Sequence, residues 1–354
     1  MQTRPVPFST GFPLLLCLSL LTASASAQPW TQIAPPPTPE ARDGAVLVHD
    51  PVRKQLVLFG GRALDDSDET WTLEGDVWTR RSPAHSPAAR ANAYGYWDSA
   101  RSKVVVFGGN GAGQIDRATF WSWDGSDWSS STPAASPPPR RDAAVTYDSA
   151  RDRVVLFGGV VDGSPDVSLA DTWEFDGSRW IETTPALSAG DRGGAMMGYD
   201  PVQKRVVMVN GYSEAQRSLR WDTWTYDGSS WKELPSANTP RGGSLRMVWD
   251  AAQQKLLIAG RHETGKLTAW YFDGAVWSEQ PGATFNLNGA DEPSVAFDAD
   301  AGYVLYLREE GQSYRGFRLR NGSWDQLLPV VQPGPAGAGR GVLFYDAEAG
   351  EMRL

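Results

Sequence analysis

Arginine recurs in this sequence at a fixed place, eight residues ahead of a repeated aspartate. The arginines that keep this spacing are Arg42, Arg90, Arg140 and Arg192. Arg241 and Arg340 are near-equivalents, displaced by one and two positions, and the sixth copy carries Ala290 instead. A guanidinium group binds a carboxylate through two parallel hydrogen bonds, so the series could hold an acidic ligand. It could equally pair with the repeated aspartates or with backbone carbonyls and tie the fold together, and repetition from unit to unit favours this structural role.

The aspartates belong to a segment that returns about every 50 residues. Its clearest copy is residues 147–159, YDSARDRVVLFGG, in which Tyr147 ends one strand, residues 148–150 carry the turn signals and residues 154–157 form a second strand. The repeated aspartates lie at positions 50, 98, 148, 200, 250, 298 and 346. So steady a period indicates an array of structural units that bury their apolar faces against one another.

Each unit contains signals for four strands, which we call a to d. In the third copy we expect strand a at 143–147, strand b at 154–157, strand c at 172–175 and strand d from Trp180. The Asp-Gly turn between strands c and d accepts the positive φ angles that hairpins require. Tryptophans such as Trp173 and Trp180 flank this turn, and we expect them to pack between neighbouring sheets rather than to form an exposed platform for sugars.

This pattern predicts an all-β fold, a seven-bladed β-propeller of four-stranded antiparallel blades. Because Trp30 and Pro35 precede Arg42 at the spacing seen in later units, the chain is expected to open with a strand d. That strand would close the ring by pairing residues 29–36 with an incomplete last blade, residues 338–354. The complete units are expected at about 43–91, 92–141, 142–193, 194–243, 244–291 and 292–337.

A hydrophobic strand, a glycine pair and a following tryptophan at this period resemble the kelch repeat. The glycine pair is intact at Gly60-Gly61, Gly108-Gly109 and Gly158-Gly159 and decays in the later units to Asn210-Gly211, Gly260-Arg261 and Arg308-Glu309. The likeness covers residues 29–354 and extends to galactose-oxidase-like propellers of secreted bacterial proteins. It implies an anion-binding pocket at the axis formed by the repeated arginines, beside b–c and d–a loops that share one face. The resemblance is informative about fold and much less so about function, since propellers host both binding modules and enzymes.

Several kinds of chemistry are disfavoured by the residues that are missing. A copper-radical oxidase needs a Tyr–Cys crosslink and paired histidines, whereas the one cysteine is Cys17 and the three histidines, His49, His85 and His262, occupy unrelated positions. We therefore expect no metal and no cofactor. The acidic run at 65–69 lacks the spacing of a calcium loop, so a solvated loop is the favoured interpretation. A carboxylate-based glycosidase or a sugar epimerase stays open as an alternative.

The first 27 residues have the features of a signal peptide. Arg4 supplies a positive start, residues 11–22 form an apolar core too short to span a bilayer, and residues 25–27 form an A-x-A-like cleavage site. A net charge of −9 disfavours a nucleic-acid partner, which needs a basic surface. We expect a secreted, periplasmic or cell-surface monomer without membrane insertion. Its expected role is to bind a protein or a carbohydrate through the b–c and d–a loops, with a glycan-active enzyme as the alternative.

Overall fold

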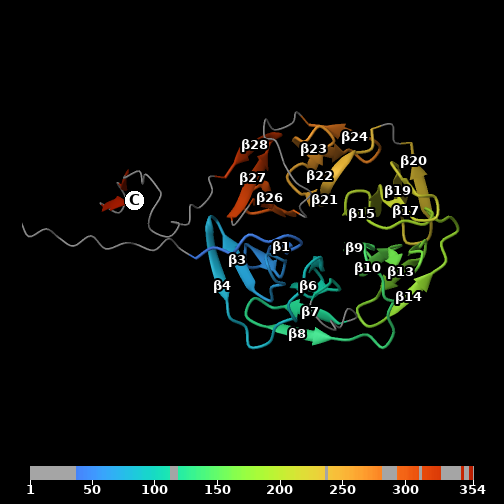
Figure 1. Ribbon diagram of the computed structural model, residues 1–354, viewed down its shortest axis with the longest axis horizontal. Coiled ribbons are helices and arrows are strands. Elements are labelled where there is room, and N and C mark those ends of the chain that lie inside the picture. The colour runs from blue at the N-terminus through green and yellow to red at the C-terminus, as the bar shows by residue number, and fades with distance from the viewer. Residues whose placement is uncertain are drawn as a thin grey trace, which may run out of the picture. The chain divides into compact units, whose positions relative to one another are not determined.

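Six four-stranded antiparallel sheets, one from each complete copy of the repeat, form the body of the protein (Figure 1). The computed structural model describes residues 37–111, 119–235, 238–280, 293–310, 313–327, 344–346 and 351–353. Blades 1 to 3 consist of β1 (Val46–Asp50), β2 (Gln55–Phe59), β3 (Thr70–Glu74) and β4 (Val77–Arg81); β5 (Tyr94–Asp98), β6 (Lys103–Phe107), β7 (Phe120–Trp123) and β8 (Trp128–Ser131); and β9 (Ala144–Asp148), β10 (Arg153–Phe157), β13 (Thr172–Phe175) and β14 (Trp180–Thr183). Blades 4 to 6 consist of β15 (Met196–Asp200), β16 (Arg205–Val209), β19 (Thr223–Tyr226) and β20 (Trp231–Leu234); β21 (Gly242–Asp250), β22 (Lys255–His262), β23 (Leu267–Phe272) and β24 (Trp277–Glu279); and β25 (Ser294–Asp298), β26 (Tyr303–Glu310), β27 (Ser313–Arg320) and β28 (Ser323–Gln326).

Three further strand pairs lie outside these sheets. They are β11 (Val160–Val161) with β12 (Val167–Ser168), β17 (Tyr212–Ser213) with β18 (Ser218–Leu219), and β29 (Phe344–Asp346) with β30 (Glu351–Arg353). The expected strand c of the third unit is confirmed, and the expected starts of its strands a and b differ from those observed by one residue. Among the described residues, no helix is long and apolar enough to cross a bilayer.

Strand b of each blade is a continuous apolar run because it is covered on both sides. In β2, Leu56, Val57 and Leu58 are fully buried. Residues of this kind form six apolar clusters, and each cluster is shared by two neighbouring blades. Tryptophans add hydrogen bonds across these seams, as where Trp128 Nε1 donates to Thr70 Oγ1 at 2.9 Å and Trp231 Nε1 donates to Thr172 Oγ1 at 3.0 Å. The expected packing of tryptophans between sheets is thus observed.

The ring closes after six blades, so the prediction of seven was wrong. The innermost strands β1, β5, β9, β15, β21 and β25 contact one another in this order, and β25 contacts β1. Leu47, Leu56 and Trp71 of blade 1 share one apolar cluster with Tyr303 and Leu305 of blade 6. This direct packing leaves no place for a blade between them. The opening strand at 29–36 therefore does not complete the ring; these residues, and most of 338–354, lie outside the described part of the chain.

The repeated aspartate shapes the turn from strand a to strand b. In blade 1, Asp50 Oδ1 accepts hydrogen bonds from the backbone N–H groups of Val52 and Arg53, each at 3.1 Å. The same carboxylate-to-backbone contacts occur at Asp98, Asp148, Asp200, Asp250 and Asp298. A buried carboxylate that satisfies turn N–H groups explains why an aspartate marks every unit.

The connection that follows strand b differs between blades that keep the glycine pair and blades that lose it. In blade 3, Gly158 and Gly159 have φ angles of +62° and +98°, and the chain turns out of the sheet into a loop. Blade 4 keeps this geometry with Asn210, at a φ of +61°. Blade 5 has Gly260-Arg261 and blade 6 has Arg308-Glu309 here, and in both blades strand b continues, so that β22 and β26 form long hairpins with β23 and β27. Where the glycine pair is lost along the sequence, the connection from strand b to strand c therefore changes from a loop to a hairpin.

Candidate binding face

The connections of each blade divide between two faces of the ring. The loop face carries the b–c and d–a connections, such as residues 158–171 and 184–195, and the turn face carries the a–b and c–d turns, such as residues 149–152 and 176–179. The turn face repeats from blade to blade because its aspartates and glycines recur. The loop face differs from blade to blade, which is where recognition residues are normally found.

Arg192 shows what the repeated arginines do. Its side chain is fully buried, and its two terminal nitrogens lie 2.6 Å and 3.1 Å from the two carboxylate oxygens of Asp222. Nη1 also donates to the backbone oxygen of Asn210 at 3.0 Å, and Nη2 donates to that of Ala189. The guanidinium group therefore crosses the top of blade 4 and joins the ends of β16 and β19 to the preceding loop.

The other predicted arginines of the first three units sit in the same way. Arg42 Nη2 lies 2.7 Å from Glu69, and Arg140 binds both oxygens of Asp171 at 2.6 Å and 2.9 Å. Arg90 is buried and donates to the backbone oxygens of Ala88 and Gly108. Each guanidinium group is thus engaged within the blade that follows it, and the structure does not gather the series into one axial pocket. A ligand role for these arginines stays a prediction, and the geometry supports the structural alternative.

Sequence analysis missed the carboxylates that meet these arginines. Glu69, Asp171 and Asp222 each stand two residues before a tryptophan of strand c, and each accepts a hydrogen bond from that indole, Trp71, Trp173 or Trp224. The recurring acid-Thr-Trp triplet was a signal that could have revealed them. Burial tends to raise the pKa of Glu69, but hydrogen bonds from Trp71 and Arg42 outweigh it and hold that pKa below its usual range.

The last two predicted arginines differ from the series. Arg241 is exposed, and its guanidinium carbon lies 5.7 Å from the ring centre of Trp221. Arg340 lies outside the described residues. Arg241 therefore does not occupy the buried position of Arg42, Arg140 and Arg192, which is consistent with its displaced spacing.

One buried arginine of the innermost layer is not predicted by the repeat. Arg246 lies on β21, in the innermost layer, and burial lowers the pKa of its guanidinium group while Tyr306, Tyr94 and Asp43 oppose that change. These four groups come from blades 5, 6, 2 and 1, so Arg246 interacts electrostatically with groups of three other blades. The Tyr94 hydroxyl donates to the backbone oxygen of Ala143 in blade 3. These contacts join blades on the loop side of the axis.

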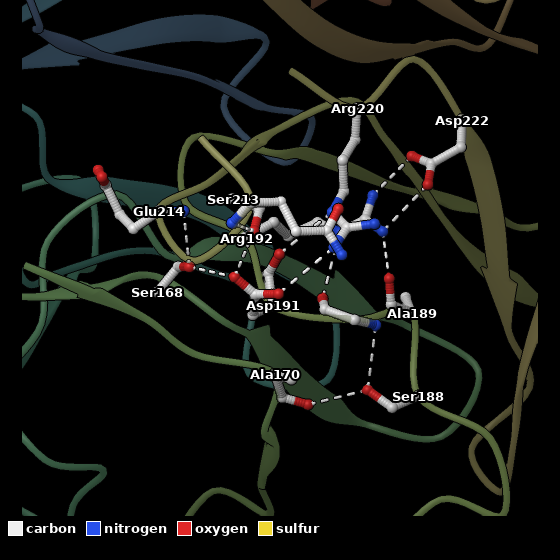
Figure 2. A network of polar contacts seen from close by, with 12 residues as sticks. Ser168, Ala170, Ser188, Ala189, Asp191, Arg192, Ser213, Glu214, Arg220 and Asp222 are labelled. Atoms are coloured by element: carbon white, nitrogen blue, oxygen red, sulfur yellow. Dashed lines mark hydrogen bonds and ion pairs between the residues drawn. The ribbon is translucent and has the colours of Figure 1, made fainter. Parts of the chain in front are cut away.

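Asp191 is the centre of a polar network on the loop face of blades 3 and 4 (Figure 2). Its Oδ2 accepts hydrogen bonds from the hydroxyl groups of Ser168 and of Ser213, the latter at 2.7 Å. Arg220 donates to Asp191 Oδ1 at 3.3 Å and to its backbone oxygen at 3.2 Å. Burial would raise the pKa of Asp191, yet the two serines and Arg220 together hold it below its usual range.

The network ties together three loops that are separate in sequence. They are residues 160–168, 186–192 and 212–220, which we call the loop cluster. Ser168 Oγ accepts from the backbone N–H of Glu214 at 3.0 Å, which links the b–c loops of blades 3 and 4. Ser188 Oγ donates to the backbone oxygen of Ala170 at 3.2 Å, which links the d–a loop to blade 3 (Figure 2). Ser168 and Ser213 are buried, so the hydrogen bonds that join these loops lie below the exposed surface.

Each loop of the cluster exposes a large aliphatic residue next to a member of the network. Val167, Leu187 and Leu219 are 54%, 52% and 57% exposed, and they adjoin Ser168, Ser188 and Arg220 in sequence. The network therefore joins three loops that each expose one aliphatic side chain. Sequence analysis assigned binding to the b–c and d–a loops but did not reveal the contacts that join these three.

Comparison with known proteins supports the fold. No protein-family model matches the sequence, and no curated protein matches it. The solved structure of YjhT is similar, with a TM-score of 0.55, 12% sequence identity, and coverage of 83% of this chain and 99% of that one. At this identity the likeness shows a β-propeller fold and nothing about ligand or activity.

Proposed function

We propose that the chain is an exported, kelch-type propeller that acts as a protein-binding module through its loop cluster. The repeat supports the kelch assignment, since a glycine pair follows strand b in the early units and a tryptophan begins strand d. Export is proposed from the signal-like residues 1–27, which lie outside the described part. The observation that carries the proposal is the polar network around Asp191, which holds Val167, Leu187 and Leu219 in exposed positions.

Preorganisation is the physical reason why this surface suits binding. Ordering loops at the moment of association costs free energy, and a network that orders them beforehand removes that cost. Burying exposed valine and leucine side chains against a partner removes apolar surface from water and so makes the free energy of binding more favourable. Because these side chains are aliphatic, the surface fits the apolar part of a protein interface better than a sugar.

The carboxylates of the arginine series fit the alternative of a glycan-active enzyme less well. A general acid needs a raised pKa, whereas Glu69 has a lowered one. Asp171 and Asp222 are held by two hydrogen bonds each from arginine and one from tryptophan. Groups bound in this way support the blade rather than act on a substrate.

Two triple variants test the proposed face. One replaces Val167, Leu187 and Leu219 by glutamate; the matched control places glutamate at Val52, Val202 and Val276, which are 59%, 60% and 46% exposed on the turn face. Peptides selected from a random display library on the unaltered protein, with a glycan array in parallel, provide the probes. We expect the loop-face variant to weaken peptide binding at least about ten-fold and the control to retain it.

Two results would count against this proposal. Peptide binding that survives the loop-face substitutions but is lost with the turn-face substitutions would place recognition on the other face. Turnover of an array glycan, abolished by one Asp or Glu substitution, would favour the enzyme instead.

A further inference from the structure

The seam between the last blade and the first brings a histidine and two aspartates together. His49 stands at the end of β1, and its Nε2 lies 3.1 Å from Asp300 Oδ2 and 3.8 Å from Asp298 Oδ1. One possible ligand atom from each residue lies within 4.8 Å of the other two. His49 and Asp298 are 12% and 8% exposed, whereas Asp300 is 37% exposed, so the group is open to water on one side.

Two of these residues depart from the repeat, and they meet at this seam. The position before the repeated aspartate is aromatic in the other complete units, namely Trp97, Tyr147, Tyr199, Trp249 and Phe297, and is His49 in the first. The position two after that aspartate is Val52, Ala100, Ala150, Val202 and Ala252 in the first five units and Asp300 in the sixth. Packing between blades accounts for the aromatic residues, whereas the second position is exposed in all six blades and carries a charge only in the sixth. Two independent departures that form one contact point to a function of the seam.

We propose that His49, Asp298 and Asp300 bind a divalent transition-metal ion of the zinc or cobalt class. Metal–ligand bonds of about 2.0–2.2 Å in a tetrahedral site place ligand atoms about 3.3–3.6 Å apart, close to the two separations measured here. An imidazole nitrogen among the donors favours zinc, cobalt or nickel over calcium or magnesium. Asp298 Oδ1 is held by the backbone N–H groups of Asp300 and Ala301, which fixes the carboxylate before an ion arrives.

One neighbouring charge opposes the ion. Lys54 Nζ lies 3.8 Å from Asp300 Oδ1, and its side chain is 73% exposed. A flexible ammonium group at this distance competes with a cation for the carboxylate and can move into solvent when the ion binds. Replacing Lys54 by methionine is therefore expected to tighten metal binding.

The site would reinforce the seam between the first and the last blade, which are the farthest apart in sequence. Five seams join blades that are consecutive in sequence. Blades 1 and 6 are not consecutive, and in the described part of the chain they meet through apolar packing and through polar contacts such as Ser294 Oγ to the backbone oxygen of Ala45 at 2.8 Å. An ion that binds the closed ring and not the unfolded chain raises stability by mass action. Sequence analysis expected no metal because the three histidines occupy unrelated positions. It could not show that His49 meets Asp300, which lies 251 positions away.

Titration with Zn²⁺ or Co²⁺ alone tests the proposal. Calorimetry measures affinity and stoichiometry, the visible absorption of Co²⁺ reports nitrogen and oxygen ligation, and thermal unfolding is followed with and without ion. His49→Tyr and Asp300→Ala restore residue types of the other blades, so both variants are expected to fold. His85→Ala is the control, because His85 pairs with a single carboxylate, Asp127, and is 72% exposed.

We expect one equivalent of ion and a rise in melting temperature on adding it. Affinity should fall at least about ten-fold in His49→Tyr and Asp300→Ala, stay unchanged in His85→Ala and increase in Lys54→Met. No saturable binding of either ion, or equal affinity in the unaltered protein and in both seam variants, would overturn the proposal. The three side chains would then form only an ion pair.

Discussion

Replacing Arg192 by alanine is expected to lower the free energy of unfolding by about 3–5 kcal/mol. The guanidinium group is fully buried and binds both oxygens of Asp222, whose side chain is 18% exposed. Removing one partner of a buried ion pair leaves the other charge without compensation, and this is the cause of the large loss. The backbone oxygens of Asn210 and Ala189 would lose their donors as well.

Urea denaturation measures this loss, with Arg241→Ala as the control. Arg241 is exposed and contacts Trp221 at 5.7 Å, so its substitution should change stability by less than about 1 kcal/mol. The double variant Arg192→Ala/Asp222→Ala should lose less than the sum of the single losses, because the pair acts as a unit. Equal stability of Arg192→Ala and Arg241→Ala, with ligand binding reduced only in the former, would show instead that Arg192 serves recognition.

Gly158→Ala is expected to destabilise the protein by about 2–4 kcal/mol. Gly158 has a φ of +62°, and a β-carbon there would lie 2.5 Å from the backbone oxygen of Arg192 and 3.0 Å from that of Leu169. The Arg192 oxygen already accepts a hydrogen bond from Gly159 N at 2.9 Å, so it cannot move away without cost. Left-handed strain and overpacking therefore add to each other.

Gly194→Ala separates the two causes. Gly194 has a similar φ of +67°, but a β-carbon there would meet no atom within 4 Å. Its substitution should cost only the conformational penalty of about 1 kcal/mol. Chemical denaturation of both variants gives the comparison. If the two losses were equal, the close approach of the Arg192 carbonyl to the glycine pair would not matter for stability.

The repeat predicted the blade because each of its signals acts locally. Asp148 satisfies N–H groups two and three residues away, and Gly177 at +92° forms the turn next to Trp180. Such short-range chemistry can be inferred from one sequence. The number of blades depends on where the chain meets itself, and the contact of Leu47 with the cluster that contains Leu305 is not encoded by any neighbouring residue. The count of seven failed for this reason.

The candidate site likewise contains residues that recur, which could be predicted from the sequence, and residues that do not recur, which could not. The arginines were found because they recur, and their contacts within the blades support the structural interpretation that repetition favoured. The network around Asp191 does not recur, since Ser168, Ser213 and Arg220 belong to loops of individual character. Arg246 was missed because its position in the other blades carries unrelated residues such as Val46 and Met196. Both proposed sites therefore lie where the sequence departs from the repeat.

A disulfide cross-link between the first and last blades tests the six-bladed ring most directly. Ala45→Cys and Ser294→Cys place thiols where Ser294 Oγ now lies 2.8 Å from the backbone oxygen of Ala45. The chain has no other cysteine than Cys17, and Ala143→Cys with Ser294→Cys pairs the equivalent residue of blade 3 as a control. If blades 1 and 6 are in contact, the Ala45→Cys/Ser294→Cys pair should oxidise rapidly to a disulfide, and the Ala143→Cys/Ser294→Cys pair should not oxidise. A blade between them would separate the two positions beyond the reach of a disulfide, and failure of the Ala45–Ser294 pair to oxidise would contradict the closed six-bladed ring.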